Sequence, residues 1–478
     1  MKAKNDLTTK ITKDTKVSAD LYSELRARGL MKPRILLVNP PIYDFSAYDF
    51  WLKPYGMLRA AGFLRGQVEF QLFDFMDRAD ARVPPGRYRS DPWGRGEFFS
   101  QPASKPNVFA DIPRQFRRFG LPRRTFRDHL LRSEPCDFAL IQTGMTYWYL
   151  GVHEAIEEIR SAWPDTKIVL GGVYATICPD HARTLGAEYV LAGTDLAPLW
   201  RFFETAPDEH AMPLWDLYPS LNSGVLKLAD GCPFRCTYCS VPQVYPKFHQ
   251  RPLDRSLAEL EFLVGLGVEH VAFYDDALLY QPEQLLKPFL REVLRRRLRV
   301  NFHTPNALNA RFISRDLADL MIDAGFKNIH LGFESSIYSW QKKTGGKVYD
   351  DELARAVSHL ISAGADMRQL HVYLIVGHPE GDEQDVAASM EFASSLGIRV
   401  MLSEFSPLPG TPDGETCRRW VDLAEPLWHN KTAFTIRLLG QREINRLKDQ
   451  ANGLNRQIIA GMRNGPSVDP RGVAVAAS

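Results

Sequence analysis

The ten residues Gly231–Ser240, with the sequence GCPFRCTYCS, constrain this chain more than any other stretch. Three cysteines fall at Cys232, Cys236 and Cys239, a C-x3-C-x2-C spacing, and an aromatic residue, Tyr238, precedes the last of them. Thiolates this close in one loop point toward a common centre, and soft ligands of this kind bind zinc, copper(I) or iron in sulfide clusters. A structural zinc site needs four ligands. A four-iron cluster held by three cysteines instead keeps one iron open to a ligand that is not protein.

The loop resembles that of the radical S-adenosylmethionine (SAM) enzymes, whose signature C-x3-C-x-aromatic-C follows the first strand of a partial βα barrel. The resemblance implies a [4Fe-4S] cluster on the three cysteines, whose open iron chelates the amino and carboxylate groups of SAM. An electron from the cluster then cleaves SAM to a 5′-deoxyadenosyl radical. The alternative is a zinc loop whose fourth ligand would be Cys178, Cys417 or His249.

Composition and charge exclude several classes of protein. The 478 residues are enough for two or three domains, and 45% hydrophobic with 24% charged residues is typical of soluble globular chains. A net charge of +2 gives no general attraction to nucleic acid or anionic membranes. We expect neither a signal peptide nor a membrane span. Because an oxidising compartment would damage the free thiols of the loop, we expect a cytoplasmic protein.

Residues 34–205 have the pattern of a Rossmann-like domain, in which apolar strands alternate with helices in a parallel sheet covered on both faces. The expected strands are Arg34–Val38, Phe70–Phe75, Phe138–Thr143, Lys167–Leu170 and Glu188–Leu191. Ligands of such sheets bind at the carboxyl ends of the strands. The polar residues 1–33 ahead of this domain are expected to form a flexible arm.

This segment resembles the cobalamin-binding (B12-binding) domain that precedes the barrel in the B12-dependent branch of the radical SAM enzymes. The resemblance is carried by VNPP after the first strand, PYGM at 54–57, GGVYAT at 171–176 and AGTD at 192–195. It implies a cobalamin site made of Pro40, Tyr55, Thr143, Gly171, Gly172, Gly193 and Asp195. The D-x-H-x-x-G sequence that gives cobalt a histidine in other cobalamin domains is absent from residues 34–205. The alternative is a Rossmann-like domain kept for packing or for another ligand.

Residues 78–134 interrupt the sheet with an insertion rich in arginine, proline and aromatic residues. Such a composition can bind phosphate or single-stranded nucleic acid. We favour an ordered insertion whose arginines pair with nearby carboxylates and whose aromatic rings pack on the rest of the chain. An insertion of this length is also the first candidate for substrate specificity. A linker is expected at residues 206–222.

Residues 223–416 repeat a strand and a helix six times, the pattern of a partial (β/α)6 barrel of the TIM type. The expected strands are Val225–Leu228, His270–Tyr274, Val300–His303, Asn328–Phe333, His371–Val376 and Arg399–Phe405. The active site of such a barrel lies at the carboxyl ends of its strands. The cysteine loop follows the first strand, as the resemblance requires. Helices are expected at 417–464, and a disordered tail at 465–478.

The residues that the resemblance assigns to SAM binding are Tyr238, Asp275, Asp276, Glu334, Ile375 and Gly377. Asp275 and Asp276 would accept hydrogen bonds from the SAM ammonium group, or else cap a helix. Glu334 would bind the ribose hydroxyls, because two acceptor oxygens suit a vicinal diol. Strand five matches much of the family motif G-x-I-x-G-x-x-E on the adenine side but has Tyr373 in place of its first glycine.

No catalytic acid or base is assigned from the sequence. His303 and His378 lie at strand ends, where we expect them to shape the pocket in preference to moving protons. The roles of Tyr338, Lys342 and Lys343 after the fourth strand stay open.

The leading functional hypothesis is a cobalamin-dependent radical SAM methyltransferase that acts on an unactivated carbon. The substrate is unknown, and a small metabolite, a lipid, a tetrapyrrole or a peptide all fit; a flavodoxin or ferredoxin is the implied electron donor. A second hypothesis is radical rearrangement, cyclisation or oxidation without methyl transfer or without cobalamin. Methylthiotransferases carry a second cluster on three N-terminal cysteines, and this N-terminal region has only Cys136 and Cys178. A remote alternative is a zinc-containing nucleic-acid-binding protein.

Overall fold

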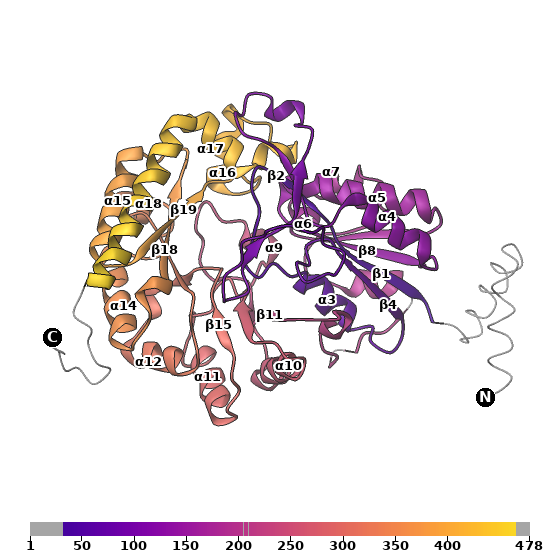
Figure 1. Ribbon diagram of the computed structural model, residues 1–478, viewed down its shortest axis with the longest axis horizontal. Helices are drawn as coiled ribbons and strands as arrows, with labels where there is room; N and C mark the ends of the chain where they lie inside the picture. Colours follow the sequence, from indigo (N-terminus) through magenta and orange to yellow (C-terminus); the bar gives the residue numbers. More distant parts are fainter. Residues whose placement is uncertain (1–31, 204, 209, 465–478) are drawn as a thin grey trace, which may run out of the picture.

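The computed structural model describes residues 32–203, 205–208 and 210–464. Two α/β units lie side by side, an N-terminal one in indigo and magenta and a C-terminal one in red to yellow (Figure 1). The expected α/β fold with parallel sheets is confirmed. The predicted disordered tail and nearly all of the predicted arm lie outside the described residues. Among the residues described, no helix combines the length and the apolar character needed to cross a membrane.

The N-terminal unit is built on a five-stranded parallel sheet in the order β10-β9-β8-β1-β4. Its strands are β1 (Arg34–Asn39), β4 (Glu69–Asp74), β8 (Phe138–Thr143), β9 (Lys167–Gly172) and β10 (Tyr189–Leu191), each overlapping a predicted one. Numbered along the chain, this is the order 2-1-3-4-5 of doubly wound sheets. The switch point of that order, where a ligand binds, lies between the carboxyl ends of β1 and β8.

Alternate residues of these strands point to two different cores, as the pleat of a strand requires. Leu36 and Val38 face α4 (Arg123–Arg132) and α5 (Tyr149–Ala162) on the outer side of the sheet. Ile35 and Leu37 face α3 (Tyr55–Gly62) and belong to a cluster that continues without a break into the barrel interior. The two units therefore share one hydrophobic core.

The insertion at 78–134 is ordered and folds against the N-terminal unit. Its strands β6 (Ser100–Pro102) and β7 (Arg117–Phe119) form a small antiparallel sheet with β2 (Ile42–Asp44), and β5 (Gly96–Glu97) pairs with β3 (Tyr48–Asp49). Eight of its twelve arginines form ion pairs with carboxylates of the described residues, in line with our expectation. The innermost pair joins Arg118 to Glu154 of α5 through two hydrogen bonds of 2.8 and 2.6 Å, with both side chains almost fully buried.

The C-terminal unit contains all six predicted barrel strands, divided between two parallel sheets. The first holds β11 (Ser223–Leu226), β14 (His270–Phe273) and β15 (Asn301–His303); the second holds β16 (Leu308–Asn309), β17 (Ile329–Glu334), β18 (Leu370–Val376) and β19 (Arg399–Glu404). The outer helices are α10 (Leu253–Gly265), α11 (Leu286–Arg295), α12 (Arg315–Asp323), α14 (Asp350–Ser362) and α15 (Glu383–Ser395). The short β16 was not foreseen, because two residues carry no periodicity.

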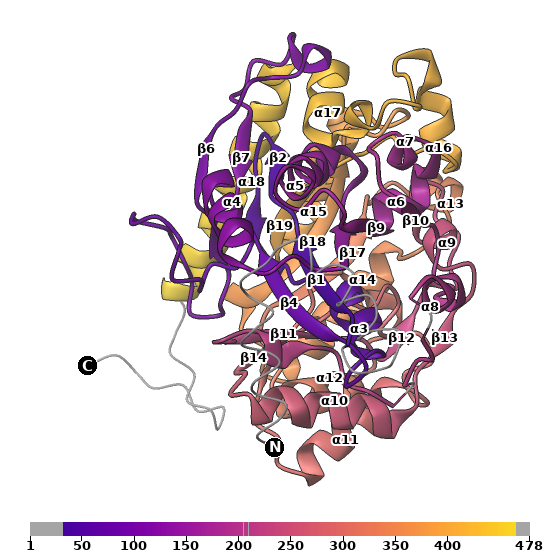
Figure 2. The same ribbon diagram turned by 90° about the vertical axis from the view of Figure 1, so that its right-hand side faces the viewer.

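Two C-terminal helices, α17 (Lys431–Leu439) and α18 (Gln441–Asn464), cover β19 and the open edge of the second sheet (Figures 1 and 2). The segment before them, 421–430, reaches the strand ends of the N-terminal unit. There His429 contacts Thr146 at 2.9 Å, and Asn430 donates to Asp44 at 2.9 Å. The two units are thus joined at a second place.

Replacing Arg118 with Met is expected to lower the free energy of unfolding by about 3–5 kcal/mol, because it leaves a buried Glu154 carboxylate without its cation. Urea unfolding followed by circular dichroism measures the change. Arg124→Met is the matched control, since Arg124 in the same insertion is 88% exposed and lies 3.6 Å from its partner Asp128. Equal effects of the two substitutions would contradict the role given to the buried pair.

Candidate active site

The cysteine loop is anchored on three sides by its neighbours. It starts at Gly231, whose φ of +81° and whose contact with the Lys247 carbonyl leave no room for a side chain. Two short antiparallel strands, β12 (Ala229–Asp230) and β13 (His249–Gln250), pair with each other and close the base of the loop. In the middle of the loop the Thr237 amide donates to the Thr344 carbonyl at 3.2 Å.

The Thr237 hydroxyl donates to Asp413 at 2.6 Å, and the same carboxylate oxygen lies 2.9 Å from Nε2 of His378. His378 therefore helps to hold the cysteine loop through Asp413. This contact agrees with the pocket-shaping role expected of that histidine.

The three thiols lie close enough to influence one another electrostatically. Burial raises the pKa of each of them, that of Cys239 to about 11. Lys347 acts in the opposite direction and lowers the pKa of all three thiols, because its ammonium group favours the thiolate form. A nearby cation is one of the features that convert a cysteine into a metal ligand.

Lys347 was missed in the sequence analysis. Its Nζ lies 2.9 Å from the Glu334 carboxylate, and Gly332 makes the space, since a Cβ there would lie 2.4 Å from that nitrogen. Glu334 itself has a φ of +75°, in the left-handed region, and follows an irregularity in the β17–β18 pairing. Strain of this kind in a non-glycine residue is typical of functional sites. In the sequence, the pair Gly345–Gly346 directly before Lys347 was the signal that could have pointed to this lysine.

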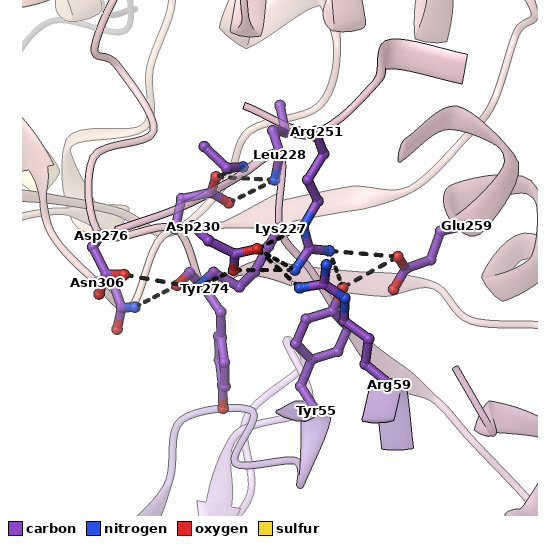
Figure 3. A network of polar contacts seen from close by, with 12 residues as sticks. Tyr55, Arg59, Lys227, Leu228, Asp230, Arg251, Glu259, Tyr274, Asp276 and Asn306 are labelled. Atoms are coloured by element: carbon purple, nitrogen blue, oxygen red, sulfur yellow. Dashed lines mark hydrogen bonds and ion pairs between the residues drawn. The ribbon is translucent and has the colours of Figure 1, made fainter. Parts of the chain in front are cut away.

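The two aspartates after β14 have different environments, and Figure 3 shows that of Asp276. Both oxygens of Asp275 accept from the backbone, at 2.9 and 3.1 Å from the Leu228 amide and 2.7 Å from the Ala229 amide, and burial raises its pKa to about 7. Asp275 is thus occupied in holding the strand end, which argues against the SAM contact expected of it. Asp276 has a buried Oδ2 that makes no hydrogen bond to a described residue but lies 3.7 Å from Nζ of Lys227, with which it forms an ion pair, and the charge of Asp276 influences Cys232.

A partly open pocket lies beside Glu334. Its walls include Ile375 and Gly377 of the predicted adenine side, together with Trp340 and His378. Tyr238 lies on the loop side, where its ring stacks on Trp340 at 6.2 Å. The structure therefore brings together four of the six predicted SAM residues, while Asp276 lies on the Cys232 side of the loop.

The side chains that would complete a zinc loop lie elsewhere. Cys178 belongs to the outer core of the N-terminal unit, and Cys417 is fully buried with its thiol directed at the Asp413 carbonyl, 3.3 Å away. His249 is exposed on β13. Among the described residues, no three His, Cys, Asp or Glu side chains converge on a position for a single metal ion.

The glycines assigned to the cobalamin site lie at open strand ends. Gly172 is exposed with a φ of +120°, and a side chain at Gly193 would enter open space. The large apolar side chains of Met145 and Val173, which follow β8 and β9, are 48% and 37% exposed. Helix α6 (Val173–Ile177) contacts α9 (Val241–Val244), so these strand ends face the segment that follows the cysteine loop.

Other residues assigned to cobalamin have contacts of their own. Thr143 is buried, and its hydroxyl joins the Gly171 carbonyl to the Ala175 amide, both at 3.1 Å. Asp195 is exposed and accepts from the Ala197 amide at the start of α8 (Ala197–Phe202). Pro40 is half-buried at the end of β1.

Tyr55 is buried where the two units meet (Figure 3). Its hydroxyl donates to Glu259 at 3.1 Å and accepts from Arg251. Arg59, one turn later on α3, pairs with Asp230 at 2.9 Å. Burial alone would raise the pKa of Asp230, but Arg251, Lys227 and Arg59 hold it well below its ordinary value. Tyr55 therefore joins the units, and its contact with cobalamin stays a prediction.

Comparison with known proteins gives two consistent findings. Residues 226–393 match the family model of the radical SAM superfamily. The chain is also 25% identical over 284 residues to the threonylcarbamoyladenosine tRNA methylthiotransferase MtaB of Thermotoga maritima, a match that covers 55% of this chain and 64% of that protein. The chain thus spans less than two thirds of this relative.

Two solved structures share the fold. One is the radical SAM methyltransferase TsrM from Kitasatospora setae with cobalamin and a [4Fe-4S] cluster bound, with a TM-score of 0.61, 16% identity and coverage of 88% of this chain and 91% of that one. The other is the cobalamin-dependent SAM radical enzyme OxsB with aqua-cobalamin and SAM bound, with a TM-score of 0.54, 12% identity and coverage of 90% and 62%.

Lys347→Met is expected to slow the alkylation of the loop cysteines by iodoacetamide in cluster-free protein, and Glu334→Gln is expected to accelerate that of Cys236. The first removes the cation that favours the thiolates, and the second removes an anion that opposes one of them. A shift of half a pKa unit changes the thiolate fraction about threefold. Mass spectrometry of quenched samples measures the rates. Lys343→Met, at an exposed lysine paired with Glu380, is the control. Changes in the same direction for both site variants would contradict this geometry.

Proposed function

We propose that this chain, whose residues 226–393 form a radical SAM domain, is a cobalamin-dependent radical SAM enzyme that methylates an unactivated carbon. The observation that carries the proposal is the cysteine loop: three mutually influencing thiols beside one cation, at the carboxyl end of the first barrel strand. When bound, a [4Fe-4S] cluster would supply the electron that cleaves SAM, and cobalamin would supply the methyl group.

The cysteines would hold the cluster, each through its own iron. The partial barrel above them would be closed by α17 and α18. The electron would come from a flavodoxin or ferredoxin, which is the usual donor in the family.

The protein groups around the loop suit the parts of SAM. The buried oxygen of Asp276, whose partner Lys227 is 3.7 Å away, would accept from the ammonium group of SAM, and Lys347 would pair with the SAM carboxylate. Glu334 would then exchange its lysine partner for the ribose hydroxyls. The pocket with Ile375 and Gly377 would take the adenine.

Cobalamin would bind at the carboxyl ends of β8 and β9, beside the switch point between β1 and β8, where Gly172, Met145 and Val173 leave an open and partly apolar surface. This surface faces the α9 end of the cysteine loop, so cobalamin there would lie next to the SAM site. No histidine of a D-x-H-x-x-G sequence is present to ligate cobalt from below. The fold shared with TsrM and OxsB over most of the chain supports the same arrangement.

The methylthiotransferase relatives suggest a second chemistry, but the N-terminal unit does not favour it. Both of its cysteines, Cys136 and Cys178, are buried in the outer core, where burial raises the pKa of each thiol to about 12. They are therefore not placed to hold a second cluster. Radical chemistry without methyl transfer stays the alternative, and cobalt content separates it from the proposal.

Anaerobic reconstitution with iron, sulfide and hydroxocobalamin, followed by desalting and metal analysis, is expected to leave about four irons and one cobalt per chain. A variant with all three loop cysteines changed to Ala is expected to lose the iron and keep the cobalt, because the two sites use different units. Iron without cobalt would favour the alternative chemistry. Zinc in place of iron would overturn both the proposed methyltransferase and the alternative radical chemistry.

Asp276→Asn is expected to weaken SAM binding to the reconstituted protein about 10- to 100-fold, because a hydrogen bond to a charged group is worth about 1.5–3 kcal/mol. Equilibrium dialysis measures the affinity. Asp275→Asn is the matched control: it should mainly reduce stability, since one of the Leu228 and Ala229 amides loses its acceptor. SAM binding lost in Asp275→Asn alone, with unchanged stability, would reverse the assignment.

A further inference from the structure

A buried side-chain amide at the carboxyl end of the barrel strand β16 still has hydrogen bonds to make. Asn309 is 7% exposed, and its Oδ1 accepts from the Arg311 amide at 3.2 Å, where η4 (Ala310–Phe312) begins. Because a backbone N–H can only donate, this contact fixes which way the side-chain amide is turned. Its Nδ2 points the other way and is buried without a hydrogen-bond partner among the described residues.

An unpaired donor of this kind is costly to keep in a native structure. Leaving a buried polar group without its hydrogen bond costs about 1–3 kcal/mol. A position that retains such a group calls for an explanation, and a ligand that accepts the hydrogen bond is one. What lies in front of the Asn309 amide therefore decides whether a ligand can reach it.

The register of the second barrel sheet shows what Asn309 faces. It pairs with Gly332 of the parallel strand β17. Residues paired in this way direct their side chains to the same face of the sheet. A Cβ at Gly332 would collide with Nζ of Lys347 and would lie 3.3 Å from Oε1 of Glu334. The Asn309 amide therefore lies next to the ion pair of Lys347 with Glu334.

A second set of contacts joins the same strand end to the cysteine loop. Nη2 of Arg311 donates to the Gly346 carbonyl at 2.5 Å, directly before the lysine of this ion pair. The ring of Phe312, the last residue of η4, lies 6.0 Å from the ring of Phe234 in the cysteine loop. Asn309 is thus held between the lysine segment and the loop.

The lysine and the amide together offer more donors than the described residues accept. Lys347 makes one hydrogen bond to a described residue, Glu334, at 2.9 Å, so two of its three N–H groups are open within this part of the chain. The Nδ2 of Asn309 adds two more. A carboxylate, with two acceptor oxygens and a negative charge, matches neighbouring donors of this kind. Glu334 suits hydroxyl groups instead, so the two ends of this cluster select different parts of a ligand.

We infer that Asn309 binds the carboxylate of SAM together with Lys347, through its unpaired Nδ2. This inference deepens the proposed function and rests on it for the identity of the ligand. The residue would distinguish SAM from adenosine compounds that carry the same sulfonium, ribose and base without a carboxylate. Asn309 was not predicted from the sequence, because an asparagine at such a position is equally suited to begin a helix.

The test compares SAM with decarboxylated SAM, which keeps the adenosine and the sulfonium, by equilibrium dialysis against the full chain with and without the reconstituted cluster. Asn309→Asp keeps the acceptor for the Arg311 amide and replaces the donor with a negatively charged oxygen. Its affinity for SAM should fall about tenfold or more, because a hydrogen bond to a charged group is lost and two like charges meet. Its affinity for decarboxylated SAM should not fall.

The melting temperature separates a ligand contact from a structural role. Asn309→Asp removes an unpaired donor beside Lys347, so it should melt at or above the wild-type temperature, whereas a residue needed for folding would melt lower. Asn309→Leu has a similar shape and no charge, and it should also weaken SAM binding selectively, which excludes a new ion pair with Lys347 as the cause. Asn301→Asp is the matched control at the amino end of β15, where the Asn301 amide donates to the Glu269 carbonyl at 3.3 Å.

Wild-type affinity for SAM in both Asn309 variants, or an equal loss for SAM and decarboxylated SAM, would overturn the role given to Asn309. A wild-type chain that binds no SAM in either form would overturn the SAM site and this role with it. Iron and cobalt contents are measured separately. Failure to bind cobalamin would therefore sink the proposed methyl transfer and leave this binding result standing.

Discussion

The structure depends on one hydrophobic core that passes from the inner face of the N-terminal sheet into the barrel. Ile35 and Leu37 of β1 belong to the same buried cluster as Val225 of β11 and Leu331 of β17. A continuous core of this extent opposes hinge motion between the two units, because separating them would expose the apolar faces of both. The strand ends of the two sheets are therefore held facing each other, and a reaction shared between two cofactors needs such a fixed arrangement.

The elements were predictable where the sequence carries a strong period. All five strands of the N-terminal sheet and all six expected barrel strands are present, because buried parallel strands give continuous apolar runs bounded by turn residues. The shared core was not predictable. Its inward-facing residues read as ordinary strand residues, and periodicity shows that a face is buried without showing what covers it. The boundaries expected at 205 and 223 therefore divide the chain by sequence pattern, across a core that is continuous.

The candidate site shows the same limit at the level of single side chains. The cysteine spacing identified the loop, since three ligands within eight positions are a local property. The roles of Asp275 and Asp276 depend on which of them meets the backbone of a preceding strand, which is a long-range contact. Lys347 escaped notice because one lysine in a loop has no pattern. The contacts of Tyr55 with Glu259 and Arg251 were not foreseen because a motif shows where a residue stands in the chain and not which neighbour it meets.

The contact between Arg59 and Asp230 has a consequence for the order of assembly. Asp230 directly precedes the cysteine loop, and its carboxylate is held partly by a helix of the N-terminal unit, which leaves the ribosome first. When residues 223–250 emerge, α3 is already available as a template against which the base of the loop can set. The middle of the loop, held by Thr344 and Asp413, can take its final form only after the later segments that carry these residues have been made, so the base and the middle of the loop become fixed at different stages in the life of the chain.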